Sequence, residues 1–149
     1  MFQPVFVITA SLMVLQAQTQ DRADQIISLS EMLNQTAQSR AEALTQNPAA
    51  PSPAAEFSDP VLTGLTEFAL AAHQLSRAVE HSGGPMDLRC IFRGMSEDAN
   101  RHLEALSQDA LRADHARTYR EIARLTAQAG DIAADPEAQA ASAFACASD

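Results

Sequence analysis

Apolar residues recur every three or four positions along most of this chain, a spacing that places them on one face of an α-helix. In the clearest run the steps alternate between four and three, as they do along the packing seam of helical bundles. This run consists of Val61, Leu65, Phe68, Ala72, Leu75 and Val79. The pattern predicts an amphipathic helix that buries one face against other helices.

The local sequence marks both ends of this helix. Asp59 can cap it, and the ring of Pro60 presets the backbone of the first helical position. His81 falls in the last turn. Gly83-Gly84-Pro85 then stops the helix, because glycine readily adopts the C-terminal cap conformation and proline cannot continue a helix.

Three further stretches show the same helical spacing. The first, from about Thr19 to Gln46, has Ile26, Leu29, Leu33, Ala37 and Leu44 on its apolar face. The next, from about Met86 to Ser107, has Leu88, Phe92, Met95, Ala99, Leu103 and Leu106. The last shows Leu111, His115, Thr118, Ile122, Leu125, Ala129 and Ile132. We therefore expect one helix in residues 18–46 and three in residues 60–134.

The apolar phase slips by one residue after Leu106, which indicates a turn near Ser107-Gln108-Asp109 with Asp109 as the next helix cap. A single bent helix is the alternative, because no Gly or Pro marks the junction. Residues 47–59 are rich in proline and alanine and predict an extended linker. Residues 135–149 form an alanine-rich tail.

Short connections favour antiparallel neighbours, so the predicted fold is all-α: an up-down antiparallel four-helix bundle. In this topology the start of the third helix and the end of the fourth share one end of the bundle. The tail could then bring Cys146 to Cys90, and a disulfide would stabilise the fold by roughly 3 to 4 kcal/mol. Two unpaired thiols are the alternative. Gly94 lies one turn beyond Cys90 on the same helix face. A glycine there could let the tail lie close to the helix backbone, and the alternative is that it has no such role.

The N-terminal segment predicts export. Val5 to Leu15 is an apolar run too short to span a membrane, since spanning needs roughly 18 residues, and it ends near Ala17. We therefore expect residues 1–17 to be a signal peptide and the mature protein to be periplasmic or secreted. The segment before the run carries no Lys or Arg. An uncleaved anchor and a buried first helical turn are the alternatives.

Composition excludes several function classes. The formal net charge is -9, and all ten basic residues are arginines. Nucleic-acid binders neutralise phosphates with basic surfaces, so nucleic acid is not an expected partner. Without lysine the chain can form neither a Walker-type phosphate loop nor a Schiff base.

Histidines are the first candidates for chemistry, because helical bundles often hold cofactors. His73, His102 and His115 lie on or beside predicted inward faces, and Asp98 is one turn before His102. No CxxCH motif and no Glu-x-x-His pair accompanies them. We therefore assign no metal or cofactor, and treat these four residues as weak metal candidates beside a purely structural role.

Arg89, Arg93, Glu97 and Arg101 form a ladder at four-residue spacing, with opposite charges from Arg93 to Glu97 and from Glu97 to Arg101. A solvated helix face explains this arginine ladder. The sharper hypothesis is a patch that binds an anionic surface of a partner.

These observations predict a small exported helical bundle that acts by protein interaction or structural binding, without catalysis. Its partner would be a protein of the cell envelope or exterior, and a homodimer is possible because the first helix could pack in trans across its linker. The alternative is a bundle that binds a cofactor or metal through His or Met ligands, as in electron transfer.

Overall fold

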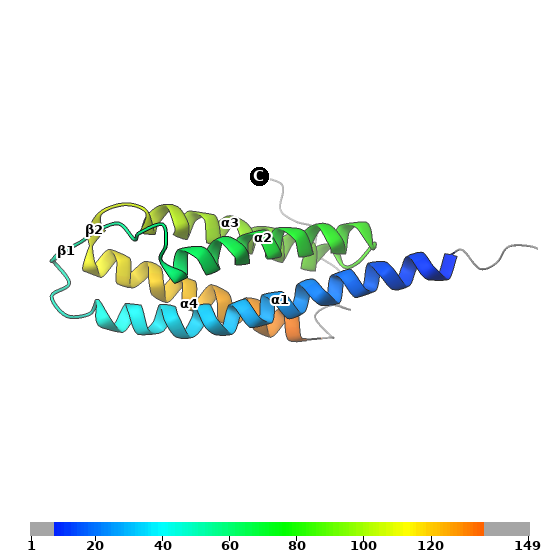
Figure 1. Ribbon diagram of the computed structural model, residues 1–149, viewed down its shortest axis with the longest axis horizontal. Coiled ribbons are helices and arrows are strands. Elements are labelled where there is room, and N and C mark those ends of the chain that lie inside the picture. Colours follow the sequence, from blue (N-terminus) through cyan, green and yellow to red (C-terminus); the bar gives the residue numbers. More distant parts are fainter. Residues whose placement is uncertain (1–7, 136–149) are drawn as a thin grey trace, which may run out of the picture.

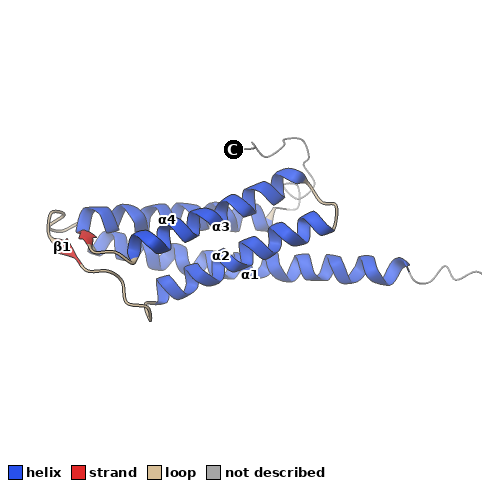
Figure 2. Cartoon of the chain, turned by 90° about the horizontal axis from the view of Figure 1, so that it is seen from above, coloured by secondary structure: helices blue, strands red, loops and turns tan. Residues whose placement is uncertain are grey.

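The computed structural model describes the backbone of residues 8–135 and the side chains of residues 20–135. Its four helices are α1 (Ile8–Ala43), α2 (Pro60–His81), α3 (Met86–Leu106) and α4 (Arg112–Ala134). Each helix runs antiparallel to the next, and α4 returns beside α1 (Figures 1 and 2). The described part is thus an up-down four-helix bundle, as the apolar spacing predicted.

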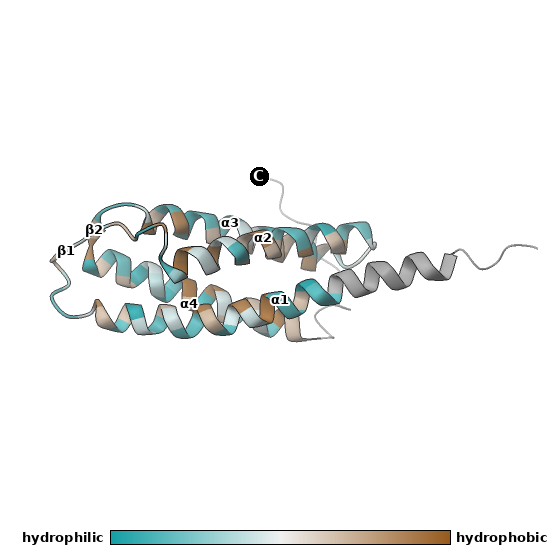
Figure 3. Cartoon of the chain, in the orientation of Figure 1, coloured by the Kyte–Doolittle hydropathy of each residue, from teal (hydrophilic) through white to brown (hydrophobic). Residues whose placement is uncertain are grey.

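The core lies between the four helices, and Figure 3 shows hydrophobic and hydrophilic residues alternating along each of them. All six residues of the predicted α2 face are buried. Phe68 of α2 and Phe92 of α3 are the largest fully buried side chains. On α1 the buried line includes Ser30, whereas the predicted Leu29 is only partly buried. The predicted position Leu111 is wrong, since this residue precedes α4 and is 47% exposed.

Both predicted ends of α2 are confirmed. Asp59 caps the helix by accepting a hydrogen bond from the Val61 amide at 2.8 Å. At the other end Gly83 adopts a φ of 68°, and the Gly84 amide donates to the Val79 carbonyl at 2.9 Å. These are the features of a glycine-terminated helix, in which a left-handed residue lets later amides reach unpaired carbonyls.

The predicted break between α3 and α4 is also present, and it excludes a single bent helix. However, Asp109 does not cap α4, which begins at Arg112 without a side-chain cap. The Asp109 carboxylate instead accepts a hydrogen bond from the Ala54 amide at 2.8 Å. The carboxylate is therefore bonded to the linker and not to the start of α4. The local sequence does not predict this long-range contact.

Residues 47–59 make backbone hydrogen bonds to the connection between α3 and α4. Strand β1 (Pro51–Ser52) pairs antiparallel with β2 (Ala110–Leu111), which joins the two long connections of the bundle. The Ala55 amide extends this pairing by donating to the Leu106 carbonyl at 2.8 Å. We call this end of the bundle the loop end. The predicted extended conformation is present at β1. Turns flank this strand, in which the Ala50 amide donates to the Asn47 carbonyl and the Asp59 amide donates to the Glu56 carbonyl.

Two glycines let α1 approach its neighbours closely. A Cβ built on Gly64 of α2 would lie 2.7 Å from Met32 Cε, and one built on Gly130 of α4 would lie 3.2 Å from Ser30 Cβ. Neighbouring side chains would have to shift to accept these methyl groups. Helix α1 thus packs closely against α2 and α4.

Helix α1 runs through the predicted cleavage position after Ala17, and its first turns project beyond the other helices (Figure 1). A helical backbone there does not test cleavage, so export stays a prediction. The predicted tail, apart from Asp135, lies outside the described residues together with Cys146. None of the helices within residues 8–135 combines the length and apolarity required to cross a bilayer.

Candidate functional site

The predicted histidines occupy three different helices. His73 is exposed on α2, His102 is partly buried on α3, and His115 is buried on α4. Within residues 8–135, no group of three or more His, Cys, Asp or Glu side chains is arranged to hold a metal ion.

His115 is a hydrogen-bonded part of the loop end. Its Nε2 lies 3.0 Å from the carbonyl oxygen of Gln108, and its Nδ1 lies 2.8 Å from the hydroxyl of Ser52. A carbonyl can only accept, so Nε2 donates to Gln108, and Nδ1 forms the hydrogen bond with Ser52. This histidine therefore connects α4 to both long connections and has no ring nitrogen left for a ligand.

His102 faces charged residues on α3 and α4. Its Nδ1 lies 3.8 Å from a carboxylate oxygen of Glu121. Burial lowers the pKa of His102 below its ordinary 6.5, although the negative charges of Glu121 and Asp98 oppose this shift. The predicted neighbour Asp98 forms an ion pair with Arg101.

The arginine ladder lies along α3 with acidic partners for each arginine. Arg89 pairs with Glu80 of α2 at 3.0 Å, and Arg93 lies 3.9 Å from Glu97, as predicted. The predicted Glu97–Arg101 pair is wrong, because Arg101 pairs with Asp98. The positive charge of the ladder is therefore largely offset by neighbouring carboxylates.

Cys90 lies in the second turn of α3 and is partly buried. Its predicted partner Cys146 is outside the described residues, so the structure does not test the disulfide. No described atom lies within 4 Å of a Cβ built on Gly94.

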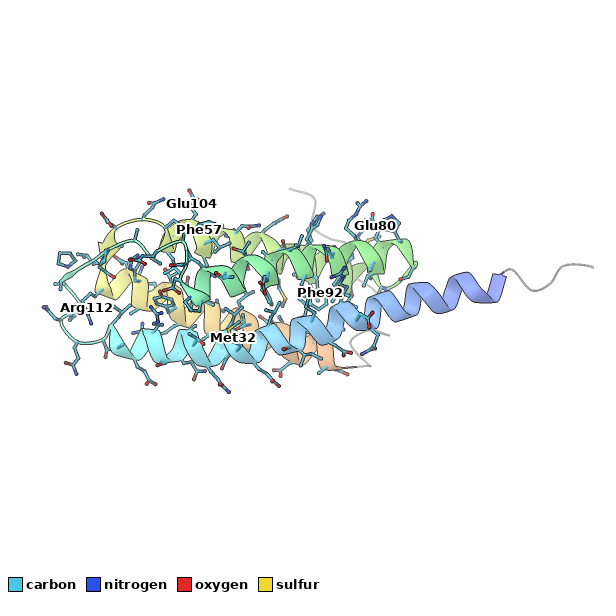
Figure 4. The ribbon with its side chains drawn as sticks, in the orientation of Figure 1. Met32, Phe57, Glu80, Phe92, Glu104 and Arg112 are labelled. Carbon is cyan, nitrogen blue, oxygen red and sulfur yellow. The ribbon has the colours of Figure 1, made fainter. Side chains whose placement is uncertain are left out.

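An apolar groove lies between α2 and α3 near the loop end, with a volume of about 440 Å³. Phe57, from the connection after β1, borders it with 97% of its surface exposed. Figure 4 shows Phe57 toward the same end of the bundle as Arg112, far from Glu80. The groove is lined by Phe57, Leu62, Thr63, Thr66, Glu67, Leu103 and Ser107.

A second cavity, the polar pocket, lies between the end of α1, the linker and the start of α4. Its volume is about 350 Å³. Its lining residues are Arg40, Ala43, Leu44, Ser52, Pro53, Ala54, Ala55, Asp59, Arg112, His115 and Tyr119. Arg40 and Arg112 supply two positive charges and Asp59 one negative charge, so the wall is net positive in a chain of net charge -9.

Each charged residue of the polar pocket also forms a hydrogen bond or an ion pair with another part of the chain. Asp59 accepts from the Val61 amide through Oδ1 and pairs through Oδ2 with Arg40 at 3.2 Å. Arg112 donates to the carbonyl oxygens of Ala43 at 2.7 Å and Gln46 at 3.0 Å. Each charged side chain of the pocket therefore has a hydrogen-bond or ion-pair partner within the fold.

Tyr119 forms part of the pocket wall and is only 5% exposed. The hydrogen bonds of the described residues leave its phenol oxygen without a partner. Burial raises the pKa of Tyr119 above 10.0, the charge of Asp59 raises it further, and the charge of Arg40 opposes both. The phenol is thus a protonated donor at neutral pH.

Neither cavity is indicated by the helical pattern of the sequence. Phe57 carried a usable signal, since it is a lone aromatic in a polar, proline-rich segment. Tyr119 is the only tyrosine of the chain, but its place on the inner face of α4 is equally typical of a core residue. The pocket roles of Arg40 and Arg112 depend on contacts between segments far apart in sequence, and no local pattern marks them.

Comparisons with protein-family models, curated proteins and solved structures found no match to this chain. The two cavities are therefore the features of this chain from which a function can be inferred.

Proposed function

We propose that this protein is an exported helical bundle that acts by binding another protein of the cell envelope or exterior, without catalysis. The observation that carries this proposal is Phe57, which is 97% exposed beside an apolar groove of about 440 Å³. Exposed aromatic side chains at apolar cavities are typical of interaction surfaces, where a few such residues supply most of the binding energy.

Charge around the groove indicates the partner's chemistry. Glu67 lines the groove, Glu56 precedes Phe57, and Glu104 follows Leu103; all three carboxylates are exposed. A partner segment with an apolar side chain flanked by Arg or Lys would fill the groove and pair with this rim. The groove suits this partner better than the arginine ladder suits an anionic one, because the ladder's charges are offset.

Placing a photoreactive residue at position 57 in the native host tests the groove. The matched control places it at Met86, which is 49% exposed at the opposite end of the bundle. We expect a crosslinked protein from position 57 only. Binding of that purified protein should then weaken at least about ten-fold in Phe57→Ala, and not in Leu70→Ala. Equal affinities for the two variants would overturn the proposal.

Export and the Cys90–Cys146 disulfide belong to the same proposal. Two features support the disulfide: α3 begins and α4 ends at one end of the bundle, and the chain from Asp135 to Cys146 could extend up to about 36 Å. Intact mass of the protein from its host would show removal of residues 1–17 and loss of two hydrogens. An unprocessed chain with both thiols reduced would contradict both expectations.

The cofactor alternative has a separate test. A stoichiometric metal or visible chromophore in the native protein would support it and oppose a pure binding role. The described histidines give it no specific support, since His115 uses both ring nitrogens and His73 is exposed.

A further inference from the structure

We propose that the polar pocket binds a small organic anion, with its oxyanion held by Arg40 and Arg112 and hydrogen-bonded to the phenol of Tyr119. This site is separate from the groove beside Phe57 and does not depend on the proposed function. Its volume of about 350 Å³ suits a molecule of metabolite size.

Charge is the first argument. Asp59 and Arg40 form an ion pair and offset one another's charge, so the wall keeps one net positive charge. Arg112 uses Nε and Nη2 for backbone carbonyls, which leaves Nη1 without a hydrogen bond among the described residues. Arg40 likewise makes only the contact with Asp59 there, and its side chain is 44% exposed. Guanidinium donors in this fixed arrangement match the oxygens of a carboxylate or phosphate.

Tyr119 is the second and independent argument. A phenol that lines a pocket and makes no hydrogen bond to the described residues can donate to a ligand there. Tyr119 is 5% exposed as a residue and lines the pocket, whose wall also carries Arg40, Arg112 and Asp59. An oxyanion in the pocket would accept the hydrogen bond of this phenol, for which the described residues supply no acceptor.

The rest of the wall defines the body of the ligand. Leu44, Pro53 and Ala55 give the pocket an apolar side, which favours a carbon skeleton over a bare inorganic ion. Ser52 and His115 bond to one another and fix this wall. The expected ligand thus has an oxyanion attached to an apolar group. The oxyanion is either a carboxylate or a phosphate.

Tyrosine fluorescence tests the site directly, because Tyr119 is the only tyrosine and the chain has no tryptophan. The full-length protein is titrated with hexanoate, hexyl phosphate, hexanol and inorganic phosphate. We expect saturable changes with one or both of the organic anions, and the stronger of them identifies the preferred headgroup. Hexanol should bind at least about ten-fold more weakly, since it lacks the charge.

Variants separate specific binding from a general effect of anions. Arg40→Gln and Tyr119→Phe, measured by calorimetry, should each weaken binding of the preferred anion at least about three-fold. The matched control is Arg77→Gln on α2, which also removes an arginine from an ion pair but lies outside the pocket. Thermal melts verify that each variant is folded. Four outcomes would overturn the proposal: no saturable binding, equal binding of hexanol, inorganic phosphate binding as tightly as the organic anions, or equal losses in Arg77→Gln.

Discussion

Arg112, the first residue of α4, donates a hydrogen bond from its guanidinium to the carbonyl oxygen of Ala43, the last residue of α1, over 2.7 Å. Carbonyls in the last turn of a helix lack intrahelical donors and carry partial negative charge. The Arg112 guanidinium therefore supplies a donor for a carbonyl at the end of α1, and it holds the start of α4 beside that end.

Replacing Arg112 by Met should lower the free energy of unfolding by about 1 to 2 kcal/mol, because the carbonyls of Ala43 and Gln46 lose their donor. Denaturant unfolding measures the change. Arg120→Met on the exposed side of α4 is the control and should change stability by less than about 0.5 kcal/mol. Equal effects would show that Arg112 contributes little to stability.

Gly94 and Gly130 should respond differently to alanine. Both lie inside helices, where alanine gains up to about 1 kcal/mol in helix propensity. A Cβ at Gly94 meets no described atom within 4 Å, whereas one at Gly130 lies 3.2 Å from Ser30 Cβ. Thermal melts should therefore show Gly94→Ala more stable than wild type, and Gly130→Ala at least about 1 kcal/mol less stable than Gly94→Ala. A loss in Gly94→Ala would indicate that the C-terminal tail packs there.

His115→Ala should destabilise the protein by about 2 kcal/mol, because Ser52 and the Gln108 carbonyl lose their common partner inside the loop end. Ser52→Ala should cost less, and the double variant should cost less than the sum of the two. His73→Ala, on the exposed face of α2, is the control and should be close to neutral. Strict additivity would show that His115 and Ser52 act independently.

Stability should fall as the pH rises above about 10, because the pKa of Tyr119 is raised in the folded state, mainly by burial. The folded protein holds this proton more tightly than the unfolded chain. The stability that the protonated phenol contributes is therefore complete below its ordinary pKa, and it is lost as the pH rises through the higher folded pKa. Ultraviolet absorbance follows this single tyrosine. Asp59→Asn should lower the pKa while still capping α2, and an unchanged titration would contradict the assigned influence of Asp59.

His102 should make the protein less stable at acid pH. Burial depresses its folded pKa below 6.5, so its contribution is complete above 6.5 and is lost as the pH falls through the folded value. Proton NMR of the ring should show this low pKa. Glu121→Gln should lower it further by removing an attraction for the charged ring, and a rise in that variant would be the contrary result.

The helical framework could be predicted because its signals are local. Asp59, Pro60 and Gly83 determine the ends of α2 through their own backbone preferences, and the apolar phase slip after Leu106 located the break before α4. Helix boundaries that depend on capping residues and apolar periodicity can be predicted without knowing the rest of the fold.

The two cavities could not be predicted in this way. The Ala54–Asp109 hydrogen bond and the β1–β2 pair join residues more than fifty positions apart, and the polar pocket exists only because they close the loop end. Asp109 shows the limit plainly. Its residue type and position are typical of a helix cap. However, its carboxylate accepts a hydrogen bond from the Ala54 amide of the other connection.

The most extensive interhelical contact joins α1 to α4, the two helices farthest apart along the chain, whereas α2 and α3 meet across residues 82–85. A hairpin with so short a turn loses little chain entropy when it forms. Bringing α1 back to α4 must restrict everything in between, a loss that grows with the logarithm of loop length. The contact between α1 and α4 therefore carries the largest loop-closure cost among the helix contacts of this protein.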